Sequence, residues 1–280
     1  MDKTMKKYFA IFVVPTLAAF FVAFVIPFIM GVYLSFCDFT TVTNATFVGV
    51  SNYVKAFTNQ NFLHALWFTV KFSVVAVITI NVCGFVLALM LTQKIKGTNL
   101  FRTVFFMPNL IGGIVLGYIW QSMINGVLSK MGMTMLMDPK YGYWGMIILM
   151  NWQLIGYIMI IYIAGLQNVS LDLLEAAKID GATKLQTLTK VTIPMVMPSV
   201  TICLFLTIAN SFKMFDQNLA LTGGGPSNKT TMLALDIYDT FYGKVGFEGV
   251  GQAKAVVFFI IVAGIAMTQL VFTRRKEVES

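Results

Sequence analysis

The stretch EAAKIDGATKLQTLTKVTIP, residues 175–194, is a polar segment in a chain that is otherwise strongly apolar. Hydrophobic residues make up 58% of the 280 positions and charged residues only 11%, whereas soluble domains carry about 25% charged residues. The apolar runs on either side of the segment reach the roughly 20 residues that a helix needs to cross about 30 Å of hydrocarbon. The sequence therefore predicts an all-α polytopic membrane protein with residues 175–194 in a loop at one membrane surface.

Apolar runs elsewhere in the chain predict six transmembrane helices in a single transmembrane domain over residues 1–280. The first run follows a basic N-terminus and is longer than the core of about 7 to 15 residues found in signal peptides, so we expect a retained first span. The three cysteines are far apart, and we expect no disulfide framework and no metal site from them. The predicted spans cover residues 9–36, 66–92, 103–124, 143–166, 194–214 and 252–273.

Basic residues near the ends of the spans predict the orientation, because cytoplasmic loops are enriched in Lys and Arg. Placing both termini in the cytoplasm puts most of the twenty Lys and Arg residues on that side. The net charge of +8 is then mainly a topology signal, and no nucleic-acid partner is expected. In this orientation residues 175–194 lie in the cytoplasm.

Local sequence chemistry gives the cytoplasmic segment a bent helical shape. LDLLEAAKI, residues 171–179, contains good helix formers, and its acidic residues favour the positive end of the helix dipole. Gly181 permits a turn that other residues resist, and a second short helix is expected over residues 182–190. Pro194 is tolerated best in the first turn of a new helix. Periodicity alone leaves open a plain solvated connector.

The spacing of this segment resembles the EAA motif of permease subunits from bacterial ATP-binding cassette (ABC) importers. Glu175-Ala176-Ala177 is followed by Gly181 and then by Val191, Ile193 and Pro194. The resemblance implies the permease fold of type I ABC importers, with residues 170–193 as a cytoplasmic coupling segment that docks on a separate ATPase subunit. It assigns coupling to Glu175, Ala176, Ala177, Asp180, Gly181 and Pro194.

The glycine-rich stretch LALTGGGPSNKT, residues 219–230, is not a phosphate-binding loop. Such a loop needs G-x-x-x-x-G-K-[ST], whereas here Asn228 precedes Lys229 and Pro226 lacks an amide donor. The stretch also lies on the outer side in the predicted orientation. It resembles the outer loop of carbohydrate permeases, and this implies that an external solute-binding protein docks at Gly223, Gly224, Gly225 and Pro226. A tight Gly-Pro turn is the plainer interpretation.

Three further segments, residues 47–57, 101–120 and 246–255, resemble maltose-type sugar permeases. The resemblance implies a bacterial plasma-membrane subunit with no catalytic residues and no bound cofactor of its own. ATP and Mg²⁺ would be held by two partner ABC ATPase subunits. The other implied partners are a second, related permease chain, the extracellular solute-binding protein, the sugar and membrane lipid.

Polar side chains within the fourth and fifth spans are candidates for sugar binding, because polar groups inside a membrane are costly unless they face a cavity or a partner. At about 1.5 Å per residue both clusters lie near mid-depth, and the four in the fifth span share one helical face. A neutral polar face beside Trp and Tyr suits a sugar. Hydrogen bonding between helices remains an alternative role. The candidates are Asn151, Trp152, Gln153, Tyr157, Thr207, Asn210, Ser211 and Met214.

These features together predict the permease subunit of an ATP-driven importer of di- or oligosaccharides. The same motifs also fit an importer of glycerol phosphate or another polyol. An ion-coupled carrier usually needs intramembrane acids or bases and often shows inverted repeats, and neither is clear in this sequence. The sequence does not identify the sugar, nor whether the paired permease is a different chain.

Overall fold

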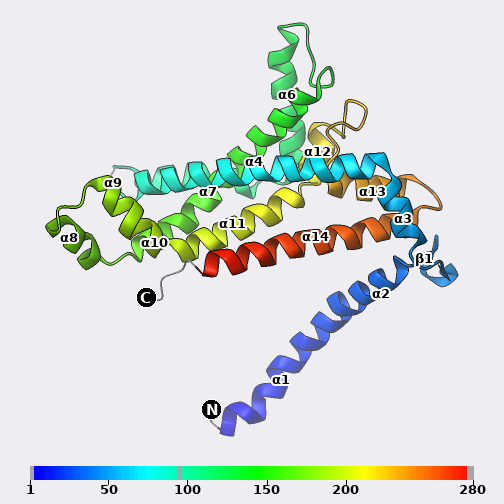
Figure 1. Ribbon diagram of the computed structural model, residues 1–280, viewed down its shortest axis with the longest axis horizontal. Coiled ribbons are helices and arrows are strands. Elements are labelled where there is room, and N and C mark those ends of the chain that lie inside the picture. The colour runs from blue at the N-terminus through cyan, green and yellow to red at the C-terminus, as the bar shows by residue number, and fades with distance from the viewer. Residues whose placement is uncertain (1–2, 94–95, 276–280) are drawn as a thin grey trace. The chain divides into compact units, whose positions relative to one another are not determined.

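The computed structural model describes residues 3–93 and 96–275, and almost all of its regular structure is helical (Figure 1). The chain folds into two compact units. The first unit contains the residues up to Phe62 together with Ile237–Ile260, and the second contains Leu63–Asp236 together with the residues from Ile261 onward. The prediction of one permease domain stays a prediction.

The first unit begins with one long apolar run of helix. It consists of α1 (Lys3–Phe20), a π-helical turn η1 (Phe21–Val25) and α2 (Ile26–Leu34). The short strands β1 (Cys37–Asp38) and β2 (Thr46–Phe47) then pair antiparallel, with the 3-10 turn η2 (Val42–Asn44) between them. The unit also holds α3 (Ser51–Thr58), the first residues of α4 (Gln60–Leu91), most of α13 (Leu233–Gly243) and the first half of α14 (Glu248–Arg274).

Two buried polar side chains in the first unit have partners on neighbouring elements. The side-chain amide of Asn52 donates hydrogen bonds to the carbonyl oxygens of Ser35 (3.1 Å) and Cys37 (2.8 Å). Lys254 is fully buried, donates to Oγ1 of Thr240 at 2.7 Å, and lies 5.1 Å from the centre of the Phe62 ring. Such partners are needed because an isolated buried charge is very costly.

The second unit is built around α4, α7 (Pro139–Gln167) and α11 (Met197–Phe212) (Figure 1). One polar cluster ties these helices together in their apolar surroundings. The Asn81 amide donates to Oγ1 of Thr207 at 2.9 Å, and the Tyr162 hydroxyl donates to Oδ1 of Asn81 at 2.8 Å. These bonds replace the water that the membrane interior cannot supply.

Close backbone approaches also shape this bundle. A Cβ on Gly156 of α7 would collide with the backbone carbonyl of Phe105 in α5 (Thr98–Phe106). The 3-10 turn η3 (Met107–Leu110) follows α5, and α6 (Gly113–Ser129) then leaves at an angle of 101°. The predicted span 103–124 therefore corresponds to two helices with a sharp break. Pro108 lies in the turn before the break, and Ile111 and Gly112 have extended backbones that end the helix.

The remaining elements of the second unit follow α7 in order. They are α8 (Leu171–Ile179), α9 (Lys184–Thr187), the π-helical turn η4 (Leu188–Thr192), α10 (Ile193–Met195), α11, α12 (Asp216–Leu221), the start of α13, and the second half of α14.

The helices match the predicted class of an all-α polytopic membrane protein. Among the described residues, four helical runs are long and apolar enough to cross a membrane, namely Ile11–Leu34, Gln60–Leu91, Pro139–Gln167 and Glu248–Arg274. Two bent pairs, Thr98–Leu110 with Gly113–Ser129 and Lys184–Met195 with Met197–Phe212, bring the number to six if each pair is counted as one span.

Candidate functional site

The polar segment after α7 is a pair of short helices joined by a tight glycine turn. Ser170 caps α8 by accepting a hydrogen bond from the backbone N–H of Asp172 at 3.2 Å. At the other end Gly181 has φ +74°, and the N–H groups of Gly181 and Ala182 donate to the carbonyls of Lys178 (3.2 Å) and Ala177 (2.9 Å). This is the Schellman arrangement that terminates helices. The helix predicted over 171–179 and the turn at Gly181 are confirmed.

The second short helix begins directly after this turn. Thr183 and Gln186 form a reciprocal capping box, with the Thr183 N–H donating to Oε1 of Gln186 at 2.8 Å and the Gln186 N–H donating to Oγ1 of Thr183 at 3.3 Å. The helix predicted over 182–190 is present as α9 followed by η4. Pro194 lies in the first turn of α10, which meets α11 at a bend of 69° between the two helical runs.

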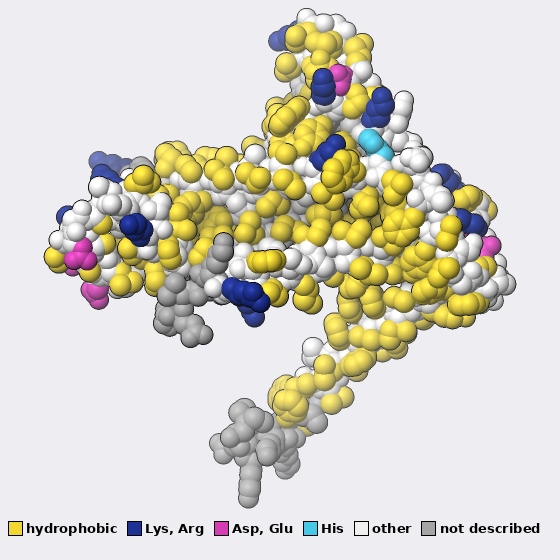
Figure 2. Space-filling model, viewed as in Figure 1, with side chains coloured by type: hydrophobic (Ala, Val, Ile, Leu, Met, Phe, Trp, Pro, Cys, Tyr) yellow, Lys and Arg dark blue, Asp and Glu magenta, His cyan; other side chains and the backbone are white. Residues whose placement is uncertain are grey.

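The surface of residues 170–193, the predicted coupling segment, carries exposed apolar side chains. Ile179 is 85% exposed, Leu171 73% and Leu185 68%. Charged side chains gather around α8 and α9, whereas the flanks of the long helices are mostly hydrophobic (Figure 2). Exposed apolar groups with a polar rim are typical of protein interaction sites. Of the predicted coupling residues, Glu175, Ala176, Asp180 and Gly181 are exposed, and Ala177 and Pro194 are half-buried.

The glycine-rich loop of residues 219–230, which we call the outer loop after its predicted side of the membrane, is organised by one buried amide, that of Asn218 on α12. Its Nδ2 donates to the Thr230 carbonyl at 2.8 Å and to Oγ1 of Thr222 at 2.9 Å, and its Oδ1 accepts from the N–H of Met232 at 2.9 Å. The Thr230 hydroxyl in turn donates to the Gly225 carbonyl at 2.6 Å. These bonds hold both ends of the loop to one side chain, so the loop is fixed in shape.

The glycines of this loop are required by backbone conformation and by space. Gly223 and Gly224 have φ of +54° and +80°. A Cβ on Gly224 would collide with Oγ1 of Thr231, and a Cβ on Gly225 would come within 2.6 Å of Leu136 Cδ2. Gly223 is exposed, Gly224 is buried, and Gly225 and Pro226 are half-buried. The next three side chains, Ser227, Asn228 and Lys229, are exposed at the loop tip.

A polar cavity of about 280 Å³ lies where α7, α11, α12 and η3 meet. Three of the predicted sugar-binding residues line it, namely Gln153, Asn210 and Met214. The sequence interpretation did not assign the other polar side chains in its wall to sugar binding. They are Asn109, Lys213, Asp216 and Gln217.

Hydrogen bonds through Gln153 close one side of the cavity. Its Oε1 accepts from Nε2 of Gln217 at 2.9 Å, and its Nε2 donates to the carbonyl of Ile111 at 3.4 Å. Helix α12 is held in place by α6, because Gly117 allows the backbone of α6 to approach Ala220 and Gln121 donates to the Leu221 carbonyl at 2.9 Å. Gln153 therefore links α7 to α12 and to the break before α6.

The structure separates the other predicted sugar-binding residues from this cavity. Thr207 and Ser211 are fully buried and bond to carbonyls of their own helix, at Cys203 (2.7 Å) and Ile208 (2.8 Å). Their face of α11 packs inward, and for Thr207 the partner is Asn81 of α4.

The predicted sugar-binding residues on α7 are also divided, because Gln153 lines the cavity and the other three do not. The amide of Asn151 donates to the Ile147 carbonyl at 2.8 Å, and the Trp152 ring lies edge-on to Trp120 with centroids 5.7 Å apart. Tyr157 is half-buried against the hydrophobic core. The polar and aromatic side chains of this stretch thus face different neighbours.

Two sequence signals could have located the missed wall residues. Gln217 follows Lys213 by four residues, just after the apolar run of the fifth span ends, and Asn109 follows Pro108 within an apolar stretch. Asn218 carries a weaker signal, as a single amide ahead of the glycine-rich stretch.

Among the described residues, no group of three or more His, Cys, Asp or Glu side chains is arranged to hold a metal ion.

Residues 80–276 match the protein family described as "Binding-protein-dependent transport system inner membrane component". The chain belongs to this family. It is therefore a non-catalytic permease subunit of an ABC importer and a multi-pass membrane protein, as the EAA resemblance implied.

Curated relatives match this permease over nearly their whole length. The "Probable starch degradation products transport system permease protein AmyD" of Thermoanaerobacterium thermosulfurigenes is 41% identical, with 97% of this chain and 96% of that protein covered. The "Multiple sugar-binding transport system permease protein MsmF" of Streptococcus mutans is 32% identical, with 99% of each covered.

Solved structures support the same fold. A chain of a bacterial ABC transporter involved in the import of the acidic polysaccharide alginate superposes with a TM-score of 0.82 at 20% identity, covering 98% of both chains. At this identity the likeness establishes the fold alone. The predicted permease fold of type I importers is confirmed.

Proposed function

We propose that this permease forms the sugar pathway of an ATP-driven importer of di- or oligosaccharides. The observation that carries the proposal is the polar cavity, because a neutral set of amides faces it from several elements at once. Amide side chains supply both donors and acceptors, and sugar hydroxyls need both. The names of the AmyD and MsmF relatives, which refer to starch degradation products and to multiple sugars, support this substrate class.

The sugar site is the wall formed by Gln153, Asn210 and Met214 with Gln217 and Asn109. Thr207 and Ser211 lie on the buried side of α11 and hold this helix in the bundle, and they do not contact the sugar directly. The remaining predicted residues, Asn151, Trp152 and Tyr157, belong to a wider shell around the site.

A charged cargo such as glycerol phosphate is not favoured by this cavity. Its wall contains one cation, Lys213, and one anion, Asp216, so that it carries no net charge. A phosphate would need an excess of cations or a cluster of donors.

Coupling to ATP uses the segment of residues 170–193. Two ATPase subunits bind ATP and Mg²⁺, and this chain binds no cofactor. The exposed face of α8, with Glu175, Ala176, Asp180 and Gly181, docks on one ATPase. Helix α10 connects that segment to α11, which carries Asn210 near its far end and is followed by Met214. Movement of the docked ATPase therefore reaches the cavity through one continuous run of chain.

The other partners follow from the same arrangement. Both termini and the coupling segment lie in the cytoplasm of a bacterial cell, and the loop at Gly223–Pro226 faces outward. A solute-binding protein docks on that loop, whose exposed tip is held rigid by Asn218. A second, related permease completes the pathway, and lipid surrounds the pair.

The function is tested by reconstituting the complete importer in proteoliposomes and measuring uptake of radiolabelled maltooligosaccharides. Asn210→Leu removes one hydrogen-bonding group from the cavity wall and should lower uptake about tenfold, the effect of losing about 1.4 kcal/mol. Gln167→Leu is the matched control, because Gln167 is exposed at the end of α7 and lies outside the cavity. Equal uptake by the two variants would overturn the assignment of the cavity.

A further inference from the structure

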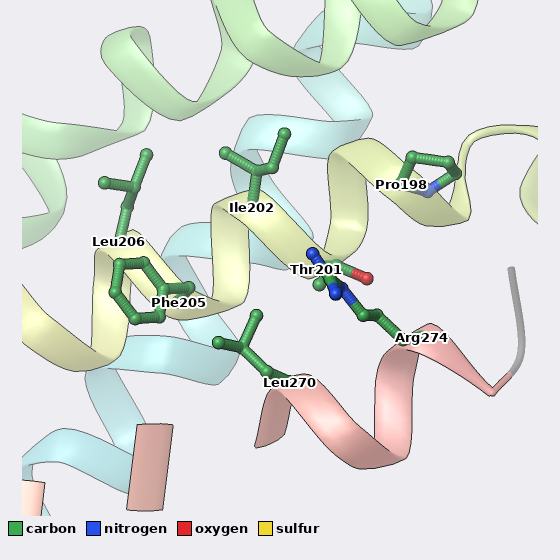
Figure 3. Close-up of a pocket in the computed structure, with 7 residues that line it drawn as sticks. All are labelled: Pro198, Thr201, Ile202, Phe205, Leu206, Leu270 and Arg274. Carbon is green, nitrogen blue, oxygen red and sulfur yellow. The ribbon is translucent and has the colours of Figure 1, made fainter. Parts of the chain in front are cut away.

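A second cavity, of about 300 Å³, lies between α11 and the last turns of α14. Figure 3 shows side chains from both helices facing the same space. Seven residues line it, namely Pro198, Thr201, Ile202, Phe205, Leu206, Leu270 and Arg274.

The walls of this groove are apolar except at one end. Ile202 is 50% exposed and Phe205 36%, and Leu270 faces them from α14 (Figure 3). Arg274, in the last turn of α14, extends across the end of the groove toward Thr201 (Figure 3). No hydrogen bond or ion pair joins Arg274 to another residue in the described part of the chain.

The length of the groove matches half of a lipid bilayer. From Pro198 to Leu206 the chain rises about 12 Å along α11, at about 1.5 Å per residue. One leaflet of the hydrocarbon core is about 15 Å thick, half of the usual value. In the proposed orientation Pro198 and Arg274 lie at the cytoplasmic surface, and Leu206 lies near the bilayer centre.

We propose that this groove binds an anionic phospholipid of the cytoplasmic leaflet. One acyl chain lies along Ile202, Phe205 and Leu270, and the lipid phosphate pairs with Arg274. Basic pockets between transmembrane helices on the cytoplasmic side are suited to anionic headgroups, and a guanidinium can bind a phosphate with two parallel hydrogen bonds. The assignment rests on the proposed orientation of the chain.

The groove does not suit the sugar. Its side-chain walls offer few polar groups, whereas the cavity near Gln153 has amides. Thr201 does not supply a free hydroxyl for this purpose, because its Oγ1 donates to the Met197 carbonyl at 3.1 Å. A bound lipid would instead brace the junction of α11 and α14, where Nε2 of Gln269 donates to the Thr201 carbonyl at 3.2 Å.

The test uses the assembled importer in nanodiscs of phosphatidylcholine with brominated phosphatidylglycerol, or with brominated phosphatidylcholine in its place. Phe205→Trp puts a fluorophore in the groove, and its signal is the difference from the same importer without that change. We expect the brominated anionic lipid to quench it at least twofold more than the neutral one. Arg274→Gln should abolish that preference. Arg275→Gln should retain it, because Arg275 carries the same charge one residue away but does not line the groove.

Three results would overturn the proposal. Equal quenching by the two lipids would show a groove filled without regard to charge. Equal loss in the Arg274 and Arg275 variants would show general surface attraction, and no quenching by either lipid would show that protein, such as the second permease, covers the groove. Native mass spectrometry without the Phe205 substitution gives a second readout, in which Arg274→Gln but not Arg275→Gln loses phosphatidylglycerol. Sugar uptake by the same importer variants in proteoliposomes separates failure of this proposal from failure of the proposed function.

Discussion

The coupling segment and the outer loop both contain a turn that requires glycine, but for different reasons. Gly181 needs only its left-handed backbone, since a Cβ there would meet nothing within 4 Å. Gly224 needs the same type of backbone and also the absence of a side chain, because Thr231 occupies the space. The first region has an exposed surface, whereas the second is packed against its own chain. We call the coupling segment an exposed joint and the outer loop a rigid platform. Both appear in the sequence as polar stretches that contain glycine, although their structures differ.

The largest expected effect is loss of the side chain that organises the outer loop. Asn218→Leu leaves the Thr230 carbonyl and the Met232 N–H without their partner, and each such buried group costs about 1 to 3 kcal/mol. Thermal unfolding of the purified permease should occur at a clearly lower temperature. Asn99→Leu, at an exposed position on α5, is the control and should change little. Similar unfolding temperatures for the two variants would contradict a rigid platform.

Gly224→Ala should have the next largest effect. It combines an unfavourable backbone angle, φ +80°, with a collision against Oγ1 of Thr231, and the expected loss is about 2 to 3 kcal/mol. Adding Thr231→Ala removes the hydroxyl but not the backbone strain. The double variant should recover about half of the lost stability in the same unfolding assay. Complete recovery would mean that the backbone angle does not matter.

Gly181→Ala should destabilise the folded chain least, by about 1 kcal/mol, because only the left-handed backbone opposes it. Gly181→Asn should cost less still, since Asn tolerates this conformation better than Ala. Both variants should retain the unfolding temperature of the wild type within a few degrees. If Gly181→Ala is as damaging as Gly224→Ala, the distinction between joint and platform fails.

Local chemistry could be predicted from the sequence where it depends on neighbours in the chain. The helix over 171–179, the turn at Gly181 and the apolar spans all follow from short-range propensity, glycine chemistry and hydropathy. The break in the helix between Leu110 and Gly113 was not predicted. Hydropathy averaged over this stretch stays high through Ile111, and it carries no information on the direction of the helix axis.

The cavity was harder to predict because it depends on which side of each helix faces inward. Helical spacing predicted one shared face for Thr207, Asn210, Ser211 and Met214. Thr207 and Ser211 do share a buried face of α11, where the Asn81 amide donates to Thr207, but Met214 lies beyond the end of that helix. Asn210, near the edge of that face, lines the cavity. Gln217 joins it only because α6 holds α12 against α7, a tertiary contact between segments about 100 residues apart.

The central claim is that residues 170–193 form a cytoplasmic joint for an ATPase, and labelling at Ile179 tests it most directly. Ile179→Cys places a thiol at a site that is 85% exposed, in a Cys83→Ser background because the other two native cysteines are buried. A membrane-impermeant maleimide should label it in inside-out vesicles that lack the ATPase subunits, and the bound ATPase should block that labelling. Labelling from the outer side, or equal labelling with and without the ATPase, would contradict the account.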